Sequence, residues 1–347
     1  GPRLLHVVTK KGKGYLPAEA DPVRFHGLGP FDINDGVSLA KDCSVPTTYT
    51  EIFGKKLVEL GEKDKKIVAI TAAMPEGTGL DKFHGAFPER FFDVGIAEGH
   101  AVCFASGLAR QGLKPVVAIY STFLQRAYDQ IIEDVALQET AVVFAVDRAG
   151  IVGEDGVTHQ GIFDISFLRS VPNLNIMAPS CAIELEMMLE FAFELGKPVA
   201  IRYPRGRASV YGLQSTVCGL ELGKAEVLRE GADFLVIALG SMVAAAEEAL
   251  DLLAKKNLHG TLINARFIKP LDKELFNLFS ARSKHIFTIE EGIVDGGFGS
   301  AVAESLNKPV IRIGLPCAFI PHGKRDILLE KYGLTPKGIA DKIRAII

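Results

Sequence analysis

Short, uninterrupted apolar runs recur along the chain, and segments with the apolar spacing of helices separate them. Clear examples of the runs lie within residues 66–74, 114–121, 141–148 and 198–206. A strand that is apolar on every residue is buried on both faces, so helices must cover both sides of its sheet. Strands that alternate with helices in this way are joined by crossovers and lie parallel. The pattern therefore predicts an α/β fold.

The alternation falls into two parts, and a break between them lies near residues 207–220, where small and polar residues interrupt it. We expect two doubly wound, mainly parallel-sheet domains, at 46–210 and 211–347. Residues 1–45 contain one strand-like run, LLHVVT, followed by a Gly- and Pro-rich extended segment with no core of its own. We interpret residues 1–45 as the tail of a further, truncated domain.

Charge and cysteine content exclude several classes of protein. The net charge is −3 and no basic block is present, which disfavours a nucleic-acid partner. Five cysteines are scattered without a CxxC pair, as in proteins that keep reduced thiols. No apolar run reaches the length that crosses a membrane. We therefore expect a cytoplasmic protein that binds neither nucleic acid nor membranes.

An acid stands at the start of an otherwise apolar helix in the segment DVGIAEGHAV, residues 93–102. Glu98 lies beside His100, and the residues that follow are mostly Ala, Val, Phe and Leu. Burying a carboxylate in such surroundings is costly unless something specific meets it. Either Glu98 points to water, where it would interact with the helix dipole, or it meets a partner that the sequence does not contain.

Several further strands are followed by chemically capable residues, and the carboxyl ends of parallel strands are where ligands bind in such sheets. These residues are Tyr120, Ser121, Phe123, Gln125, Arg126, Asp147, Arg148, Glu154, Asp155, Thr158, His159, Arg202, Tyr203 and Arg205. Each one alone has an ordinary structural explanation, as a core aromatic, a turn residue or a surface ion pair. Their joint position at one edge favours a functional site. The spacing of Glu154, Asp155 and His159 matches no strong metal motif, so we expect no metal ligands there.

Seven sequence blocks resemble the 1-deoxy-D-xylulose-5-phosphate synthase family, which belongs to the transketolase superfamily of thiamine diphosphate enzymes. They are HVVTKKGKGYLPAE, DVGIAEGHAV, YSTFLQRAYDQ, DRAGIVGEDGVTHQG, RYPRG, FIKPLD and GLPCAFIPHG. The resemblance runs along the whole chain. One departure is Gly99, where the family usually carries Gln between the Glu and the His.

The resemblance implies a place for the cofactor. Glu98 would meet a pyrimidine ring nitrogen of thiamine diphosphate and act as a catalytic residue. Phe123 would stack on the pyrimidine, with Tyr120 and Ile96 beside it. The Mg²⁺ and diphosphate ligands of the superfamily lie in a GDG…N motif of an amino-terminal domain. This chain has no such motif, so we expect no metal ligand within it.

The resemblance also implies a reaction: pyruvate loses carbon dioxide and is joined to glyceraldehyde 3-phosphate, giving 1-deoxy-D-xylulose 5-phosphate, a precursor for isoprenoids, thiamine and pyridoxal. Arg148 and Arg205 suit the acceptor's phosphate, because guanidinium matches phosphate as a bidentate donor. Asp155 and His159 suit orientation and proton transfer, and Tyr120 also contacts substrate. His26 is carried over as a further catalytic group, and Arg126 is expected behind these residues.

Assembly and alternatives follow from the same resemblance. We expect a homodimer, with the amino-terminal domain supplied in the same chain or by a second one, and no activity from this chain alone. A subunit of a split transketolase-like enzyme and a 2-oxoacid dehydrogenase beta subunit share the same domain plan and stay open as alternatives. A non-catalytic module with this fold would be expected to lose Glu98 or Phe123, and both are present.

Overall fold

The computed structural model describes residues 1–26, 31–37, 39, 48–209 and 219–347. The chain forms two compact units, Gly1–Pro46 and Thr47–Ile347, and each is described by itself. Two of the cysteines, Cys43 and Cys218, lie outside the described residues, as does the domain boundary expected between residues 210 and 211.

The first unit holds the short helix α1 (Leu16–Ala20) and a single 3₁₀ turn, η1 (Arg24–His26). The strand expected at LLHVVT is wrong, because residues 1–10 are not in a strand and Leu4 is 96% exposed. A strand is held by backbone hydrogen bonds to a neighbour, and the described part of this unit offers none to that run.

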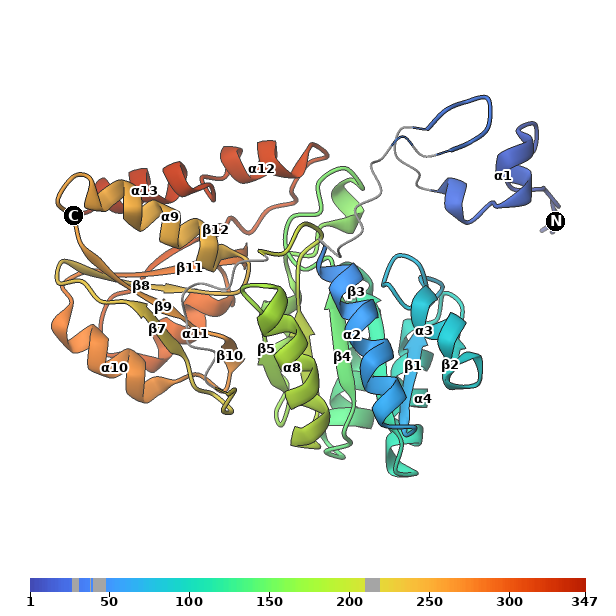
Figure 1. The fold of residues 1–347 in the computed structure, drawn as a ribbon, viewed down its shortest axis with the longest axis horizontal. Coiled ribbons are helices and arrows are strands. Elements are labelled where there is room, and N and C mark those ends of the chain that lie inside the picture. The colour runs from blue at the N-terminus through green and yellow to red at the C-terminus, as the bar shows by residue number, and fades with distance from the viewer. Residues whose placement is uncertain (27–30, 38, 40–47, 210–218) are drawn as a thin grey trace. The chain divides into compact units, whose positions relative to one another are not determined.

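The second unit contains a seven-stranded sheet in its described residues, with the strand order β10-β5-β6-β4-β3-β1-β2 (Figure 1). Its strands are β1 (Ile67–Thr71), β2 (Phe91–Asp93), β3 (Lys114–Tyr120), β4 (Val143–Asp147), β5 (Asn175–Met177), β6 (Val199–Arg202) and β10 (Phe267–Lys269). All neighbours pair in parallel except β10 and β5. Strand β10 comes from the later half of the chain, so the two predicted domains share this sheet.

Helices cover both faces of this sheet, as the apolar strands require. One face packs against α2 (Tyr49–Lys63) and α8 (Ala182–Leu195), and the other against α4 (Glu98–Arg110). Thr48 begins α2 with a capping box to Glu51. The other elements are α3 (Asp81–Ala86), η2 (Pro88–Arg90), α5 (Ser121–Leu124), η3 (Gln125–Ala127), α6 (Tyr128–Gln130), η4 (Ile131–Ala136), η5 (Val157–His159) and α7 (Asp164–Leu168).

A second sheet has five strands in the described residues, in the order β12-β11-β8-β9-β7. They are β7 (Glu226–Arg229), β8 (Phe234–Ala238), β9 (Gly260–Asn264), β11 (Ile286–Ile293) and β12 (Ile311–Leu315). Only β7 runs antiparallel to its neighbour. The accompanying helices are α9 (Met242–Ala254), α10 (Lys273–Arg282), α11 (Phe298–Ser305), α12 (Arg325–Lys331) and α13 (Pro336–Arg344).

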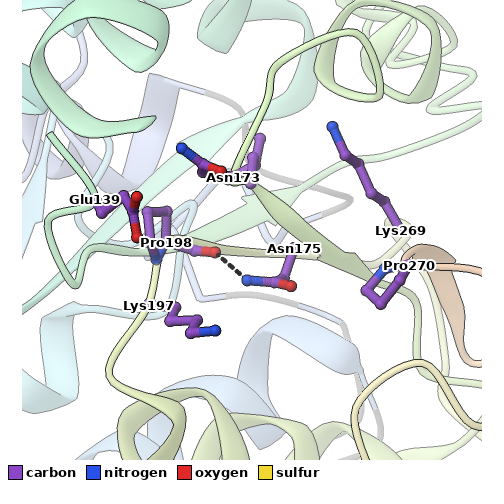
Figure 2. Close-up of a pocket in the computed structure, with 8 residues that line it drawn as sticks. Glu139, Asn173, Asn175, Lys197, Pro198, Lys269 and Pro270 are labelled. Carbon is purple, nitrogen blue, oxygen red and sulfur yellow. Dashed lines mark hydrogen bonds between the residues drawn. The ribbon is translucent and has the colours of Figure 1, made fainter. Parts of the chain in front are cut away.

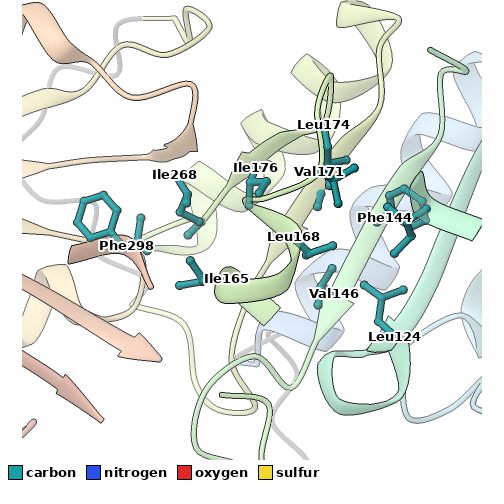
Figure 3. Close-up of a cluster of buried hydrophobic side chains, with 14 of the residues drawn as sticks. Leu124, Phe144, Val146, Ile165, Leu168, Val171, Leu174, Ile176, Ile268 and Phe298 are labelled. Atoms are coloured by element: carbon teal, nitrogen blue, oxygen red, sulfur yellow. The ribbon is translucent and has the colours of Figure 1, made fainter. Parts of the chain in front are cut away.

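The buried core runs without a break from one sheet to the other. Figure 3 shows Ile165, Leu168 and Ile176 of the first sheet region beside Ile268 and Phe298 of the later half of the chain. Each fully buried side chain of this size stabilises the fold by about 1.5–3 kcal/mol. The two sheets and their helices confirm the predicted α/β class. None of the described helices has both the length and the apolar character that crossing a bilayer requires.

Candidate active site

Glu98 lies in the first turn of α4, just beyond the carboxyl end of β2, and is only 4% exposed. Arg126 Nη1 donates a hydrogen bond of 2.6 Å to Glu98 Oε1, and the Arg126 side chain is half exposed. The acid therefore does not point to water. The sequence therefore does contain a partner for Glu98. Arg126 was expected behind the site residues, and it contacts one of them, Glu98, directly.

Two stacked aromatic rings follow at the carboxyl end of β3. The ring centroids of Tyr120 and Phe123 are 5.6 Å apart with planes at 12°, and the edge of His159 meets Phe123 at 5.4 Å. The Arg126 guanidinium lies 5.3 Å from the centre of the Phe123 ring. Burial raises the pKa of Tyr120 to about 12, so its hydroxyl is protonated at neutral pH. His159 and Arg126, the residue that holds Glu98, thus both border the Phe123 ring.

The loop after β4, residues 149–161, brings Asp155 and His159 to this edge. Asp155 Oδ1 accepts a hydrogen bond of 2.8 Å from Arg205 Nη1, so two of the predicted substrate-binding residues form an ion pair. Thr122 Oγ1 donates to the carbonyl of Thr158 at 2.9 Å, and this bond ties the loop to the segment that carries Phe123.

Arg148 is more deeply engaged than the sequence indicated. Its guanidinium pairs with Asp147 at 3.0 Å, donates to Thr50 Oγ1 at 3.1 Å and to the carbonyl of Gly77, and lies 4.2 Å from the centre of the Tyr120 ring. Its Nε is buried and has no hydrogen-bond partner among the described residues. Thr50 was not among the predicted site residues, because a hydroxyl group in a helix 98 residues before Arg148 carries no local sequence pattern that indicates this contact.

Two of the predicted site residues lie apart from this cluster or cannot be placed in it. Ile96 is 80% exposed in the loop between β2 and α4, two residues before Glu98. His26 lies in the first compact unit, at the end of η1, and its role stays a prediction.

The polar side-chain groups around Glu98 fit a planar, nitrogen-containing heterocycle. Among the described residues, Oε2 of Glu98 accepts no hydrogen bond, so this oxygen is open to a ring nitrogen. The amide oxygen Oε1 of Gln130 is buried and also lacks a described partner. A Cβ atom at Gly99 would lie 3.0 Å from that oxygen, so Gly99 leaves Gln130 more room than a Gln would. In the described residues no three His, Cys, Asp or Glu side chains gather as metal ligands.

A separate pocket of about 250 Å³, shown in Figure 2, has a lining of mixed polar and apolar residues and lies at the opposite end of the strands from the site. It is lined by Glu139, Asn173, Leu174, Asn175, Lys197, Pro198, Lys269 and Pro270. Asn175 begins β5 and Pro198 directly precedes β6, so the pocket is at the amino ends of these strands. Asn175 Nδ2 donates to the carbonyl of Pro198 at 3.0 Å. The pocket holds none of the predicted site residues.

Two family models match the chain. The model described as "Transketolase, pyrimidine binding domain" matches residues 46–209, and the one described as "Transketolase, C-terminal domain" matches residues 223–339. The first match contains Glu98, Tyr120, Phe123, Arg148, Asp155, His159 and Arg205.

Curated relatives named 1-deoxy-D-xylulose-5-phosphate synthase are similar over nearly the whole chain. The relative from Desulforudis audaxviator is 54% identical over 341 residues, which is 96% of this chain and 53% of that protein. The relative from Heliobacterium modesticaldum is 51% identical over 351 residues, covering 100% of this chain and 54% of that protein. The chain thus spans about half the length of the curated relatives it matches.

Solved structures give the same fold. A structure titled "Split gene transketolase, inactive beta4 tetramer" is 34% identical with a TM-score of 0.78, and the match covers 86% of this chain and 98% of that one. A transketolase from Campylobacter jejuni has a TM-score of 0.75 at 19% identity, covering 86% and 46% of the two chains, and supports the fold alone. On its two domain matches and these relatives, the chain belongs to the transketolase family.

Proposed function

We propose that this chain supplies the pyrimidine side of a thiamine diphosphate site in a 1-deoxy-D-xylulose-5-phosphate synthase. The reaction would join pyruvate and glyceraldehyde 3-phosphate with loss of carbon dioxide. The observation that carries the proposal is the buried Glu98, linked through Arg126 to the Phe123 ring that stacks on Tyr120. The identity of 50–54% to curated relatives with that name supports it.

Glu98 would hold a pyrimidine ring nitrogen through a shared proton. Sharing or transfer of a proton with a bound group is an ordinary acid–base role for a positioned Glu. Phe123 and Tyr120 would fix the plane of the ring. When bound, the cofactor supplies the electron sink for decarboxylation and carbon–carbon bond formation. Arg126 now pairs with the acid, and its half-exposed side chain is free to rearrange toward solvent.

The acceptor would lie against the loop of residues 149–161. Arg205 is the stronger candidate for its phosphate, because only one Arg205 nitrogen is used in the ion pair with Asp155, whereas Arg148 makes several protein contacts. His159 and Asp155 would orient the reacting oxygens and move protons, with His26 as a further group. We also propose that the complete enzyme requires Mg²⁺, forms a homodimer and is located in the cytoplasm.

A subunit of a split transketolase is the second candidate. The match to the split-gene structure covers 98% of that chain, whereas this chain spans only about half of the curated synthases. The two candidates share the Glu98 site and differ in the acceptor and in where the diphosphate-binding domain resides.

The test combines this chain with the diphosphate-binding domain of a relative, either fused or added in trans. We expect the chain alone to bind thiamine diphosphate weakly and with little dependence on Mg²⁺, because the metal and the diphosphate contacts contribute most of the affinity. The combination should bind tightly and release carbon dioxide from pyruvate when the aldehyde is present. Calorimetric titration and a decarboxylation assay measure the two properties. Tight, Mg²⁺-dependent binding by the chain alone would contradict this division of the site.

Replacing Arg205 with Ala should raise the KM for glyceraldehyde 3-phosphate about ten- to hundred-fold, because hydrogen bonds to charged groups contribute about 1.5–3 kcal/mol. The KM for pyruvate should change little, and an acceptor aldehyde without phosphate should be nearly unaffected. Steady-state kinetics with the three substrates give the comparison. Arg207→Ala is the matched control, since this exposed arginine lies two residues further along. Equal effects on pyruvate and the phosphorylated acceptor would make Arg205 a structural residue.

A further inference from the structure

The loop that carries Asp155 and His159 has a buried base and an exposed tip. At the base, Gly150 and Gly161 exchange two backbone hydrogen bonds, with N to O distances of 2.6 and 2.9 Å. Ile151 and Val152 are buried, whereas Asp155 is exposed. The tip is held by the Asp155–Arg205 ion pair and the Thr122–Thr158 hydrogen bond, both at exposed residues of the tip, so the position of the loop also depends on how firmly its buried base is fixed.

A carboxylate from the other sheet meets this base. Glu291 lies in β11, is 1% exposed, and its Oε1 accepts a 2.9 Å hydrogen bond from the backbone N–H of Ile151. Arg325 Nη2 donates to both Glu291 oxygens, at 2.7 and 2.6 Å, and Ser241 Oγ donates to Oε2 at 2.9 Å. A buried carboxylate is tolerated only when its lone pairs are satisfied in this way.

Arg325 also contacts the backbone of Ile151 directly. Its Nε donates to the carbonyl of Ile151 at 3.0 Å, so the N–H and the C=O of Ile151 are held by one ion pair. Gln160 adds a second tie. Its Oε1 accepts from the N–H of Val152 at 2.8 Å, and its Nε2 donates to the carbonyl of Pro321 at 3.3 Å.

Glycines allow the close approach. Gly150 has φ +98°, and a Cβ atom there would lie 2.6 Å from Cδ of Glu291. Gly153 has φ +90°, and a Cβ atom there would lie 2.8 Å from the backbone N of Arg325. At both positions the backbone has a positive φ, and the neighbouring atoms leave no space for a side chain. The loop is thus fitted closely to the Glu291–Arg325 pair.

We propose that the Glu291–Arg325 ion pair is a positioning device that holds the catalytic loop of residues 149–161 in register with the Glu98 site. Its catalytic consequence rests on the function proposed above. Neither residue reaches the reacting atoms; they act through Ile151. Displacement of a catalytic group by about 1 Å can cost about 10²-fold in rate. Loosening this base should therefore lower activity while the fold persists.

Hydrogen exchange tests the anchoring without any assay of activity. In the Glu291→Gln variant, a side-chain NH2 group replaces one carboxylate oxygen. This group then faces a hydrogen-bond donor instead of accepting from it, which weakens the contact to Arg325 or Ser241. The amides of residues 151–160 should exchange at least ten-fold faster, with β8 and the sheet strand β4 unchanged. Glu290→Gln is the matched control, because neighbouring strand residues face opposite sides and Glu290 bonds to α11 instead. Unchanged loop exchange in Glu291→Gln, or an equal rise in Glu290→Gln, would overturn the proposal.

A second pair of variants covers the case in which Glu291→Gln does not fold. Gly150→Ala and Gly156→Ala both place a side chain on a backbone with positive φ, +98° and +91°, but only the first places a methyl group against Glu291. Gly150→Ala should increase loop exchange well beyond Gly156→Ala. Equal increases would mean that backbone strain, and not the contact with Glu291, governs the loop.

Activity of the combined enzyme then tests the catalytic consequence. Glu291→Gln should lower kcat about ten- to hundred-fold, with thiamine diphosphate affinity unchanged because Glu98 and Phe123 are not touched. Faster loop exchange with unchanged kcat would overturn the positioning role. A wild-type combination that releases no carbon dioxide would instead refute the proposed function, and the hydrogen-exchange comparison would still decide the anchoring.

Discussion

Replacing Glu98 with Gln should abolish turnover in the combined enzyme and leave the fold intact. The amide cannot share a proton with a pyrimidine ring nitrogen as a carboxyl group does, and a positioned acid–base group contributes about 10²–10⁴-fold. The fold should persist because Gln has nearly the same shape and the lost ion pair to Arg126 involves a half-exposed partner, so it is worth little. The rate of carbon dioxide release, measured at saturating cofactor, gives the result.

Glu89→Gln is the control for the charge change, since Glu89 is an exposed acid just ahead of β2. It should retain normal turnover, and thermal unfolding of both variants should match that of the original chain. Near-normal turnover in Glu98→Gln would contradict the proposed role of Glu98 and with it the proposed function.

The central strands of the seven-stranded sheet were predictable, because strands that are buried on both faces have a recognisable apolar sequence. The runs that became β1, β3, β4 and β6 are apolar over most of their length, and the ends of these strands locate the site edge. The strand β10 was not predictable as a member of this sheet. Its three residues come from the second half of the chain, and their place depends on tertiary packing against β5.

The side chains of the site could be named from sequence, but not their partners. Arg126 was expected behind the site residues without a named partner, and the structure brings its guanidinium to Glu98 because η3 turns back over the start of α4. The Glu291–Arg325 pair gave no signal at all. Its partner is the backbone of Ile151, 140 residues away from Glu291 in sequence, and a buried backbone contact leaves no motif.

Glu290 in β11 is an acidic residue whose carboxyl group is buried inside the fold. Its carboxylate is fully buried and accepts hydrogen bonds of 2.7 Å from the N–H groups of Phe298 and Gly299, which begin α11. Burial raises the pKa of Glu290 from 4.5 to about 7, although these two N–H groups act in the opposite direction.

The sign of the stability effect follows from linkage. Between the unfolded pKa of 4.5 and the folded pKa of about 7, the folded state binds a proton that the unfolded state has released. The contribution of Glu290 to stability is therefore greatest below the unfolded pKa and is lost as pH rises through about 7. The loss amounts to about 3 kcal/mol at most, at about 1.4 kcal/mol for each pKa unit.

Glu290→Gln should remove this dependence, because Gln does not titrate. We expect the free energy of unfolding of the original chain, relative to the Gln variant, to fall by up to about 3 kcal/mol between about pH 5 and pH 8. Urea unfolding of both proteins across that range measures the difference, and all other titrating groups cancel in the comparison. Glu89→Gln should follow the original chain at every pH, since its carboxyl is exposed. Parallel pH profiles for Glu290→Gln and the original chain would mean that the two N–H groups at the start of α11 offset the cost of burial, and that Glu290 is ionised throughout this range.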